Sequence, residues 1–380
     1  MILINGFLHR ERLYQVIRRW LHDDLQAGDV DEILRLVHFN NVYVSRYLER
    51  FSARLLQGLH GAALHTETVT TKGALRDRIS RDLPRDCARC VALGAAYAHN
   101  PGQYYRETPF HGRLYFRSRS GSMQYLGSSR VKRIRRLAEK CARRVVDWLH
   151  EAGGAAGLPG APALTPAEQQ QAEQLVLLRV HDFQPAPGAL VVNDVAGVKL
   201  VLEARHFTQL LDLLQAGGDR VIEQERHDGI YRATHIVVEH HPDRAAILAE
   251  PLHDGMLRVF AAHGYSSARA DAAFREFVCA GEAGVNVEII VTGYLEMLEG
   301  EIGRCMHEDR IIRQRHNPRY YGQLAQNVGF LLEFLFTYPA LPYRTLERLP
   351  LRIRDRYLPD YFDEVRRRLF NNPSVELHEL

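Results

Sequence analysis

An aspartate precedes an apolar run in the middle of the chain. Asp194 is followed by Val-Ala-Gly-Val-Lys-Leu-Val, so the run opens with Gly197 and carries Lys199. A carboxylate at the mouth of a strand is where phosphoryl-transfer enzymes place a magnesium ligand. The glycine allows another segment of backbone to approach closely. Since Asp-x-x-Gly is also a common turn into a strand, this segment alone leaves a purely structural role open.

Two later segments add an aromatic ring, a histidine and a second carboxylate. Tyr231 and His235 stand at the start of the run Tyr-Arg-Ala-Thr-His-Ile-Val-Val, and Glu288 stands in the middle of Val-Glu-Ile-Ile-Val. An ionised glutamate among β-branched residues is costly to bury unless it is paired or bound to a metal ion. The alternative for Glu288 is a place on an exposed strand face.

A basic segment lies upstream of these three. Residues 112–119 alternate as a strand does and carry Arg117 and Arg119, and the segment 120–122 that follows is a turn signal ending in Ser122. Guanidinium groups at a strand end, beside a helix N-terminus, form an anion site. We expect a helix to follow, with Ser128 or Ser129 as its cap. An ordinary basic edge strand is the alternative.

In this order the segments resemble the synthetase motifs of the RelA/SpoT alarmone-synthetase family. There, an aspartate precedes Gly-Val-Arg, a Gly-Tyr-x-Ser-x-His stretch follows, and a strand reads Glu-x-Gln-x-Arg-Thr. The resemblance covers roughly the middle half of the chain in pieces, and the Asp194 segment is its closest part. Ile290 and Thr292 stand where the family has glutamine and arginine, so the sequence departs from the family at a phosphate-contacting position.

The resemblance implies a role for each of these residues. Asp194 and Glu288 would be the magnesium-binding and catalytic acids, and Tyr231 would stack on the guanine of the acceptor nucleotide, with His235 behind it. The remaining candidates would contact the substrates, the basic ones on the donor ATP: Arg117, Arg119, Ser122 and Lys199.

The implied activity is transfer of a pyrophosphoryl or nucleotidyl group from ATP, with Mg²⁺, to a hydroxyl of a guanine nucleotide or of tRNA. The alternative is a catalytically inactive relative that binds a nucleotide or a partner protein for regulation. A structural or nucleic-acid-binding protein is a third reading.

The elements that must position these residues divide the chain into three parts. Residues 1–104 read as helical, with stripes over 7–25 and 33–59 that Asn40 and Asn41 could interrupt. Residues 105–310 read as an α+β core with a central mixed sheet of nucleotidyltransferase type flanked by helices. They include a linker at 153–164 and strands at 112–119, 197–202, 233–239 and 285–291. Residues 311–380 read as helical again.

One predicted helix is strongly basic. Residues 130–144 contain eight lysines and arginines beside an apolar stripe, so we expect a helix that could bind RNA through phosphate contacts. A solvated charged face is the alternative.

Composition sets the remaining bounds. A length of 380 residues suggests two or three packed units, and the net charge of +3 excludes no class of partner. Five scattered cysteines indicate reduced thiols and a cytoplasmic protein, and no apolar stretch is long enough to span a membrane. Cys87 and Cys90 have the spacing of a metal pair but no second pair to complete a zinc site. The oligomeric state is left open.

Overall fold

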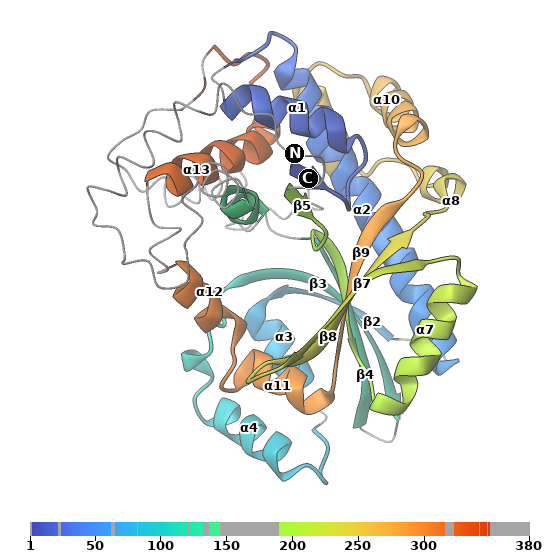
Figure 1. Ribbon diagram of the computed structural model, residues 1–380, viewed down its shortest axis with the longest axis vertical. Helices are drawn as coiled ribbons and strands as arrows, with labels where there is room; N and C mark the ends of the chain where they lie inside the picture. The colour runs from blue at the N-terminus through green and yellow to red at the C-terminus, as the bar shows by residue number, and fades with distance from the viewer. Residues whose placement is uncertain are drawn as a thin grey trace, which may run out of the picture.

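A seven-stranded mixed β-sheet forms the centre of the computed structural model, with helices on both faces (Figure 1). The structure describes residues 2–21, 24–61, 65–81, 83–119, 122–131, 137–144, 190–315, 323–341, 343–347 and 349. The expected α+β class and the mixed sheet flanked by helices are confirmed. The linker expected at 153–164 and residues 350–380 lie outside the described residues.

The strand order of the main sheet is β2-β3-β4-β6-β9-β8-β7, and a separate pair is formed by β1 and β5. Only β6 and β9 are parallel to each other within the main sheet. The strands are β1 Ile2–Ile4, β2 His65–Thr71, β3 Pro109–Arg119, β4 Ser122–Val131, β5 Leu190–Val192, β6 Ala196–Val201, β7 Arg220–Asp228, β8 Arg232–His240 and β9 Val285–Thr292.

Helices surround this sheet at both of its ends and on both faces (Figure 1). They are α1 Arg10–Leu21, α2 Asp29–His60, α3 Lys72–Ile79, α4 Ala88–His99, α7 Phe207–Ala216, α8 Arg244–Ala249, α9 Asp254–Ala262, α10 Ser267–Ala280, α11 Tyr294–Ile302, α12 His307–Arg315 and α13 Gln323–Thr337. Residues 137–144 are also helical. Single 3-10 turns occur at Pro101–Gln103, Ala204–His206 and Tyr338–Ala340.

The two faces of the sheet differ in what covers them. One face supplies Val198, Ile236 and Ile289 to the large core, where the long helix α2 packs across β4 and β6. The other face carries a smaller core over Leu114 and Val201, built with side chains of α3, α4 and α11. Side chains alternate between the two faces along a strand. The few polar residues of the central strands, Glu288 among them, therefore lie on the face with the smaller core.

The helix α2 is uninterrupted, so the interruption considered at Asn40 and Asn41 does not occur. The Asn40 side chain accepts a hydrogen bond from the Leu8 N–H (2.7 Å) and donates to the carbonyl oxygens of Leu8 (3.0 Å) and Leu36 (2.8 Å). A fully buried asparagine thus satisfies the backbone of the N-terminal segment instead of breaking the helix.

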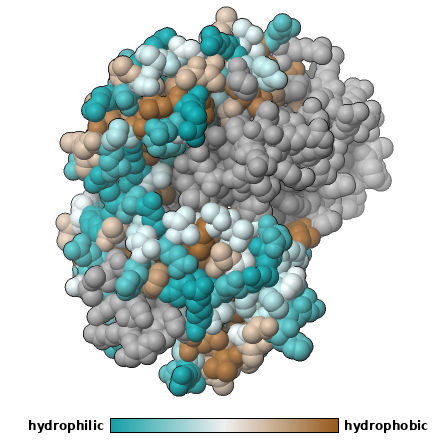
Figure 2. Space-filling model, turned by 180° about the vertical axis from the view of Figure 1, so that it is seen from behind, coloured by the Kyte–Doolittle hydropathy of each residue, from teal (hydrophilic) through white to brown (hydrophobic). Residues whose placement is uncertain are grey.

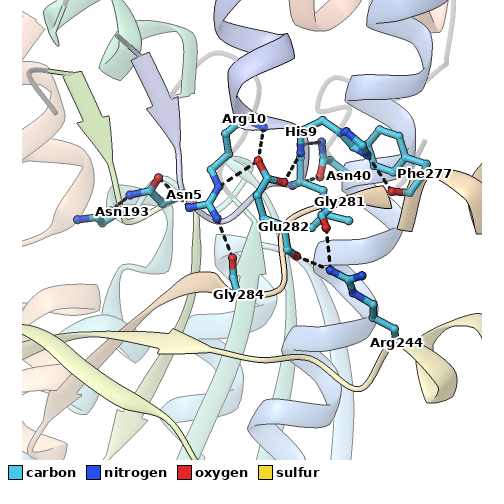
Figure 3. Close-up of polar contacts among 11 residues, drawn as sticks. Asn5, His9, Arg10, Asn40, Asn193, Arg244, Phe277, Gly281, Glu282 and Gly284 are labelled. Carbon is cyan, nitrogen blue, oxygen red and sulfur yellow. Dashed lines mark hydrogen bonds and ion pairs between the residues drawn. The ribbon is translucent and has the colours of Figure 1, made fainter. Parts of the chain in front are cut away.

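That N-terminal segment is fastened to the sheet by a polar network (Figure 3). The carboxylate of Glu282 accepts hydrogen bonds from the backbone N–H groups of His9 (2.5 Å) and Arg10 (2.9 Å). The Arg10 guanidinium donates to the Gly284 carbonyl oxygen at 2.7 Å, and Arg244 donates to the Glu282 carbonyl oxygen at 2.7 Å. The start of α1 is therefore held against the loop that enters β9.

The sequence missed several elements. The first hundred residues are mainly helical but also contribute β1 and β2, and β7 lies at the opposite edge of the main sheet. The helix expected from residue 130 begins too early, because Arg130 and Val131 belong to β4. Ser128 and Ser129 are also strand residues, so the expected role as a helix cap is wrong.

Hydrophilic residues dominate the face seen in Figure 2, with hydrophobic residues in small groups between them. Within the described ranges, every helix is too short or too polar to cross a bilayer.

Candidate functional site

The buried carboxylate of Glu288 is the centre of the candidate site. All eight residues of β9 are buried, because β6 and β8 flank this strand on its two sides. The Glu288 side chain is only 8% exposed, and its Oε1 lies 3.1 Å from Nδ1 of His235 on β8. Nε2 of His235 in turn lies 3.4 Å from the Tyr231 hydroxyl group. A carboxylate on β9, an imidazole on β8 and a phenol just before β8 therefore follow one another.

Gly197 makes room for this carboxylate. In the parallel pairing of β6 and β9, Gly197 is the partner of Glu288. A Cβ atom at Gly197 would lie 3.0 Å from the Glu288 carbonyl oxygen and 3.4 Å from its Oε2 atom. The close approach that the sequence assigned to this glycine is confirmed.

Lys199 shares the Glu288 face of the sheet. It pairs with Ile290, two residues after Glu288, and alternation places both on the same side. Its charge helps to lower the pKa of Glu301 on α11, which places the ammonium group near that acid.

Asp194 lies in the turn between β5 and β6, where the neighbouring side chain of Asn193 fixes the backbone. The Asn193 Oδ1 atom accepts hydrogen bonds from Asn5 (2.8 Å) and from Asn286 of β9 (3.0 Å); the Asn5 contact is visible in Figure 3. The carboxylate of Asp194 forms an ion pair with Lys140, from the helical residues 137–144.

The two candidate magnesium ligands come from neighbouring parts of the sheet. Asp194 precedes Gly197 by three residues, about 10 Å along an extended chain, and Gly197 is opposite Glu288. In the part of the chain that the structure describes, no group of three or more His, Cys, Asp or Glu side chains is arranged to hold a metal ion. Two carboxylates are nonetheless enough for Mg²⁺, which takes its other ligands from phosphate oxygens and water.

The basic strand end lies far from Asp194. Arg119 pairs with Ser122 at the tip of the β3–β4 hairpin, and Arg117 pairs with Tyr125. The other end of β4, Val131, pairs with Ala196 next to the Asp194 turn. Nine residues of strand separate the two ends, which is about 30 Å.

The hairpin tip is instead at the end of the sheet where β8 begins, the end nearer Tyr231. The structure therefore brings Glu288, His235 and Tyr231 together, places Lys199 on their face, and leaves Arg117, Arg119 and Ser122 at one end of the sheet and Asp194 at the other. The side chains of the three hairpin residues lie outside the described set.

A different basic segment lies beside the Asp194 turn. Arg130 pairs with Gly197, and Lys140 contacts Asp194. The signal was present in the sequence as the basic stretch 130–144, but the expectation of one continuous solvated or RNA-binding helix hid it. Leu137 and Cys141 are buried in the large core, so this segment is packed against the body of the protein.

The sequence also missed a buried cluster of charges beside the site. Lys72 and Arg76 of α3 meet Glu301 of α11 and Glu308 of α12, with Lys72 Nζ to Glu301 Oε2 at 2.8 Å and Arg76 Nη2 to Glu308 Oε2 at 2.7 Å. Burial would raise the pKa of Glu301, but the charges of Lys72, Lys199 and Arg76 lower it to about 2. Glu301 is therefore ionised in the folded protein throughout the neutral range.

The cysteine pair has a structural role. The Cys87 Sγ atom accepts a hydrogen bond from the Cys90 N–H (3.2 Å) and caps α4. Burial, together with the neighbouring Cys87, raises the pKa of the Cys90 thiol to about 12. Cys90 packs in the smaller core as a reduced, apolar residue.

Comparisons of the chain with protein-family models, with curated proteins and with solved structures found no match.

Proposed function

We propose that this protein is a magnesium-dependent nucleotide transferase that moves a pyrophosphoryl or nucleotidyl group from ATP to a hydroxyl of a nucleotide or of tRNA. The observation that supports the proposal best is the placement of Glu288. Its carboxylate is buried on the central strand beside Gly197 and contacts His235, and these three residues come from the three segments that resemble the synthetase motifs.

The geometry gives each of these side chains a task. Mg²⁺ held by Asp194 and Glu288 would supply charge neutralisation on the donor triphosphate. When Glu288 is ionised, His235 donates its Nδ1–H to it and presents Nε2 as an acceptor toward Tyr231, 3.4 Å away. The His235 ring is thereby held in one tautomer between a carboxylate and a phenol.

The reaction that follows is an in-line displacement. The acceptor hydroxyl oxygen attacks the β-phosphorus of ATP, its proton passes to Glu288, and the bond from that phosphorus to the α-phosphate oxygen breaks, releasing AMP. Lys199, on the same face as Glu288, is suited to the charge that builds on the phosphates.

The test is a mass-spectrometric search for products after incubation with Mg²⁺, ATP and a mixture of GDP, GTP and tRNA. We expect AMP and a pyrophosphorylated acceptor from the wild type, and a loss of at least about 100-fold in Glu288→Gln and in Asp194→Asn. Glu223→Gln is the matched control, because Glu223 is exposed on β7 at the sheet edge. Equal turnover in Glu288→Gln and wild type would refute the assignment.

A second candidate is a relative that binds a nucleotide without turning it over. Two residues after Glu288, Ile290 is buried and apolar, and the Thr292 hydroxyl donates to the Arg232 carbonyl oxygen at 3.2 Å. Neither position offers a cation to a phosphate group. Magnesium-dependent nucleotide binding, lost in Asp194→Asn and without any product, would favour this reading.

A further inference from the structure

The Arg310 guanidinium lies over the ring of Tyr231 and was not among the residues that the sequence singled out. Its Cζ atom is 4.2 Å from the centre of that ring. Tyr231 also neighbours His235 and, in turn, Glu288, so Arg310 stands at the rim of the candidate site. A cation over an aromatic face is favourable but leaves the N–H edges of the guanidinium for other partners.

Within the described residues, few partners accept from those N–H groups. Arg310 makes one long hydrogen bond there, from Nη2 to His307 Nδ1 at 3.4 Å, and its buried Nε atom has no hydrogen-bond partner. The acids closest in sequence are engaged elsewhere: Glu308 with Arg76, and Asp309 with the Tyr105 hydroxyl at 2.8 Å. A buried donor without a partner is costly, which makes an external acceptor the natural complement.

The helix that carries Arg310 is firmly placed. Glu308 anchors one side of α12 to the buried charges of α3, and Asp309 anchors it to Tyr105. The guanidinium is therefore presented to Tyr231 by a helix with two independent attachments, so little conformational freedom is lost when a ligand binds.

A second cation lies nearby. Burial raises the pKa of Cys305, while the charges of Arg310 and Lys199 both lower it, which places both cations near this one thiol. Lys199 faces the same side of the sheet as Glu288. Two cations beside a carboxylate, a histidine and a ring make a site suited to a phosphorylated ligand.

We infer that Arg310 is a ligand-binding residue of this site and that its guanidinium binds a phosphate group of the nucleotide, with Tyr231 holding the guanidinium in place. The inference rests on the proposed function and names one more contact for the same substrate. This phosphate contact requires both the positive charge and the planar, two-pronged N–H geometry of a guanidinium group, so lysine would replace arginine only in part.

The experiment is a calorimetric titration with three ligands: a non-hydrolysable ATP analogue with Mg²⁺, inorganic pyrophosphate, and the nucleoside adenosine. We expect Arg310→Gln to bind the two phosphorylated ligands about 10- to 100-fold more weakly and adenosine unchanged. Arg310→Lys should fall between these values. Arg313→Gln, an exposed arginine on the same helix, is the control and should bind as wild type does.

Each other outcome has a distinct meaning. Unchanged binding of the analogue by Arg310→Gln, with wild-type binding intact, overturns the inference and leaves the proposed function standing. Equal losses for adenosine and the analogue show that Arg310 supports only the ring, which also overturns it. If the wild type binds pyrophosphate but not the ATP analogue, the nucleotide function fails. A weaker binding of pyrophosphate by Arg310→Gln would still support the phosphate contact. Wild type that binds none of the three ligands refutes both. Thermal melts of each variant separate binding losses from unfolding.

Discussion

Gly197 and Glu288 face each other across the parallel strands β6 and β9, and only a hydrogen atom at Gly197 leaves space for the carboxylate. A methyl group there would lie 3.0 Å from the Glu288 carbonyl oxygen, a backbone atom that cannot move without distorting the central strand. We expect Gly197→Ala to lower the free energy of unfolding by about 1–3 kcal/mol.

Urea denaturation measures this change, and Gly300→Ala is the matched control. Gly300 lies inside α11, and a Cβ atom there would meet no atom within 4 Å. Alanine favours a helix over glycine by roughly 0.5–1 kcal/mol, so the control should be neutral or stabilised. If the two variants lose equal stability, the close approach at Gly197 is not what constrains this position.

Asn40 and Asn41 are adjacent and fully buried but differ in their bonding. Asn40 makes three hydrogen bonds, whereas the Asn41 side chain has no partner within the described ranges. Asn40→Leu leaves backbone groups of Leu8 unsatisfied and should cost about 2–4 kcal/mol. Asn41→Leu removes an uncompensated buried amide and should be neutral or stabilising. Chemical denaturation of both variants tests this, and the reverse order would contradict the bonding pattern.

The buried charges of α3, α11 and α12 make stability depend on pH. The pKa of Glu301 falls from 4.5 to about 2 on folding, so its contribution is present above about 4.5 and is lost as the pH falls toward 2. We expect Glu301→Gln to cost about 3–5 kcal/mol at pH 7, because Lys72 is left buried without its 2.8 Å partner.

Unfolding curves of the wild type and of Glu301→Gln, measured from pH 7 down to pH 3, should converge as the pH falls. The double variant Lys72→Met with Glu301→Leu removes both charges and should recover part of the stability. A constant difference between wild type and Glu301→Gln across this range would show that the charge of Glu301 is not what stabilises the cluster.

His38 gives a second, separate pH dependence. Burial lowers its pKa from 6.5 to about 4, so the unfolded chain takes up a proton before the folded one does. The contribution of His38 to stability should therefore be constant above about 6.5 and fall between 6.5 and 4, by on the order of 3 kcal/mol. His38→Leu should lack this fall, as measured by denaturation at pH 7.5, 5.5 and 4.5. If the free energy of unfolding depends on pH in the same way in the wild type and in His38→Leu, the prediction is wrong.

The central strands could be predicted because each contains a short, nearly continuous run of apolar residues. Residues 197–202, 233–239 and 285–291 all lie in or within one residue of β6, β8 and β9. The edge strand β7 was missed because polar and charged residues fill most of it and nearly every position is exposed, so it has no apolar face to detect. Its strand form comes from pairing with β8, a tertiary effect.

The site was predictable only where its residues stand inside these strands. Glu288 and His235 meet because β8 and β9 pair, and both segments were recognised. Arg310 contacts Tyr231 and Lys140 contacts Asp194 because helices far away in the sequence pack there. A local sequence pattern carries no information about such packing. The charged cluster around Lys72 was invisible for the same reason, since its basic and acidic members are more than 200 residues apart in sequence.

The attachment of the first ten residues has a consequence for how the chain folds. Ile2 pairs with Leu190, and the backbone of His9 is bound by Glu282, 273 residues away. Contacts at such separations form slowly, because a long loop must close before they add stability. On the ribosome, the N-terminal strand is made first but can be fastened in place only after residue 282 has emerged, so the docking of the start of α1 is a late event.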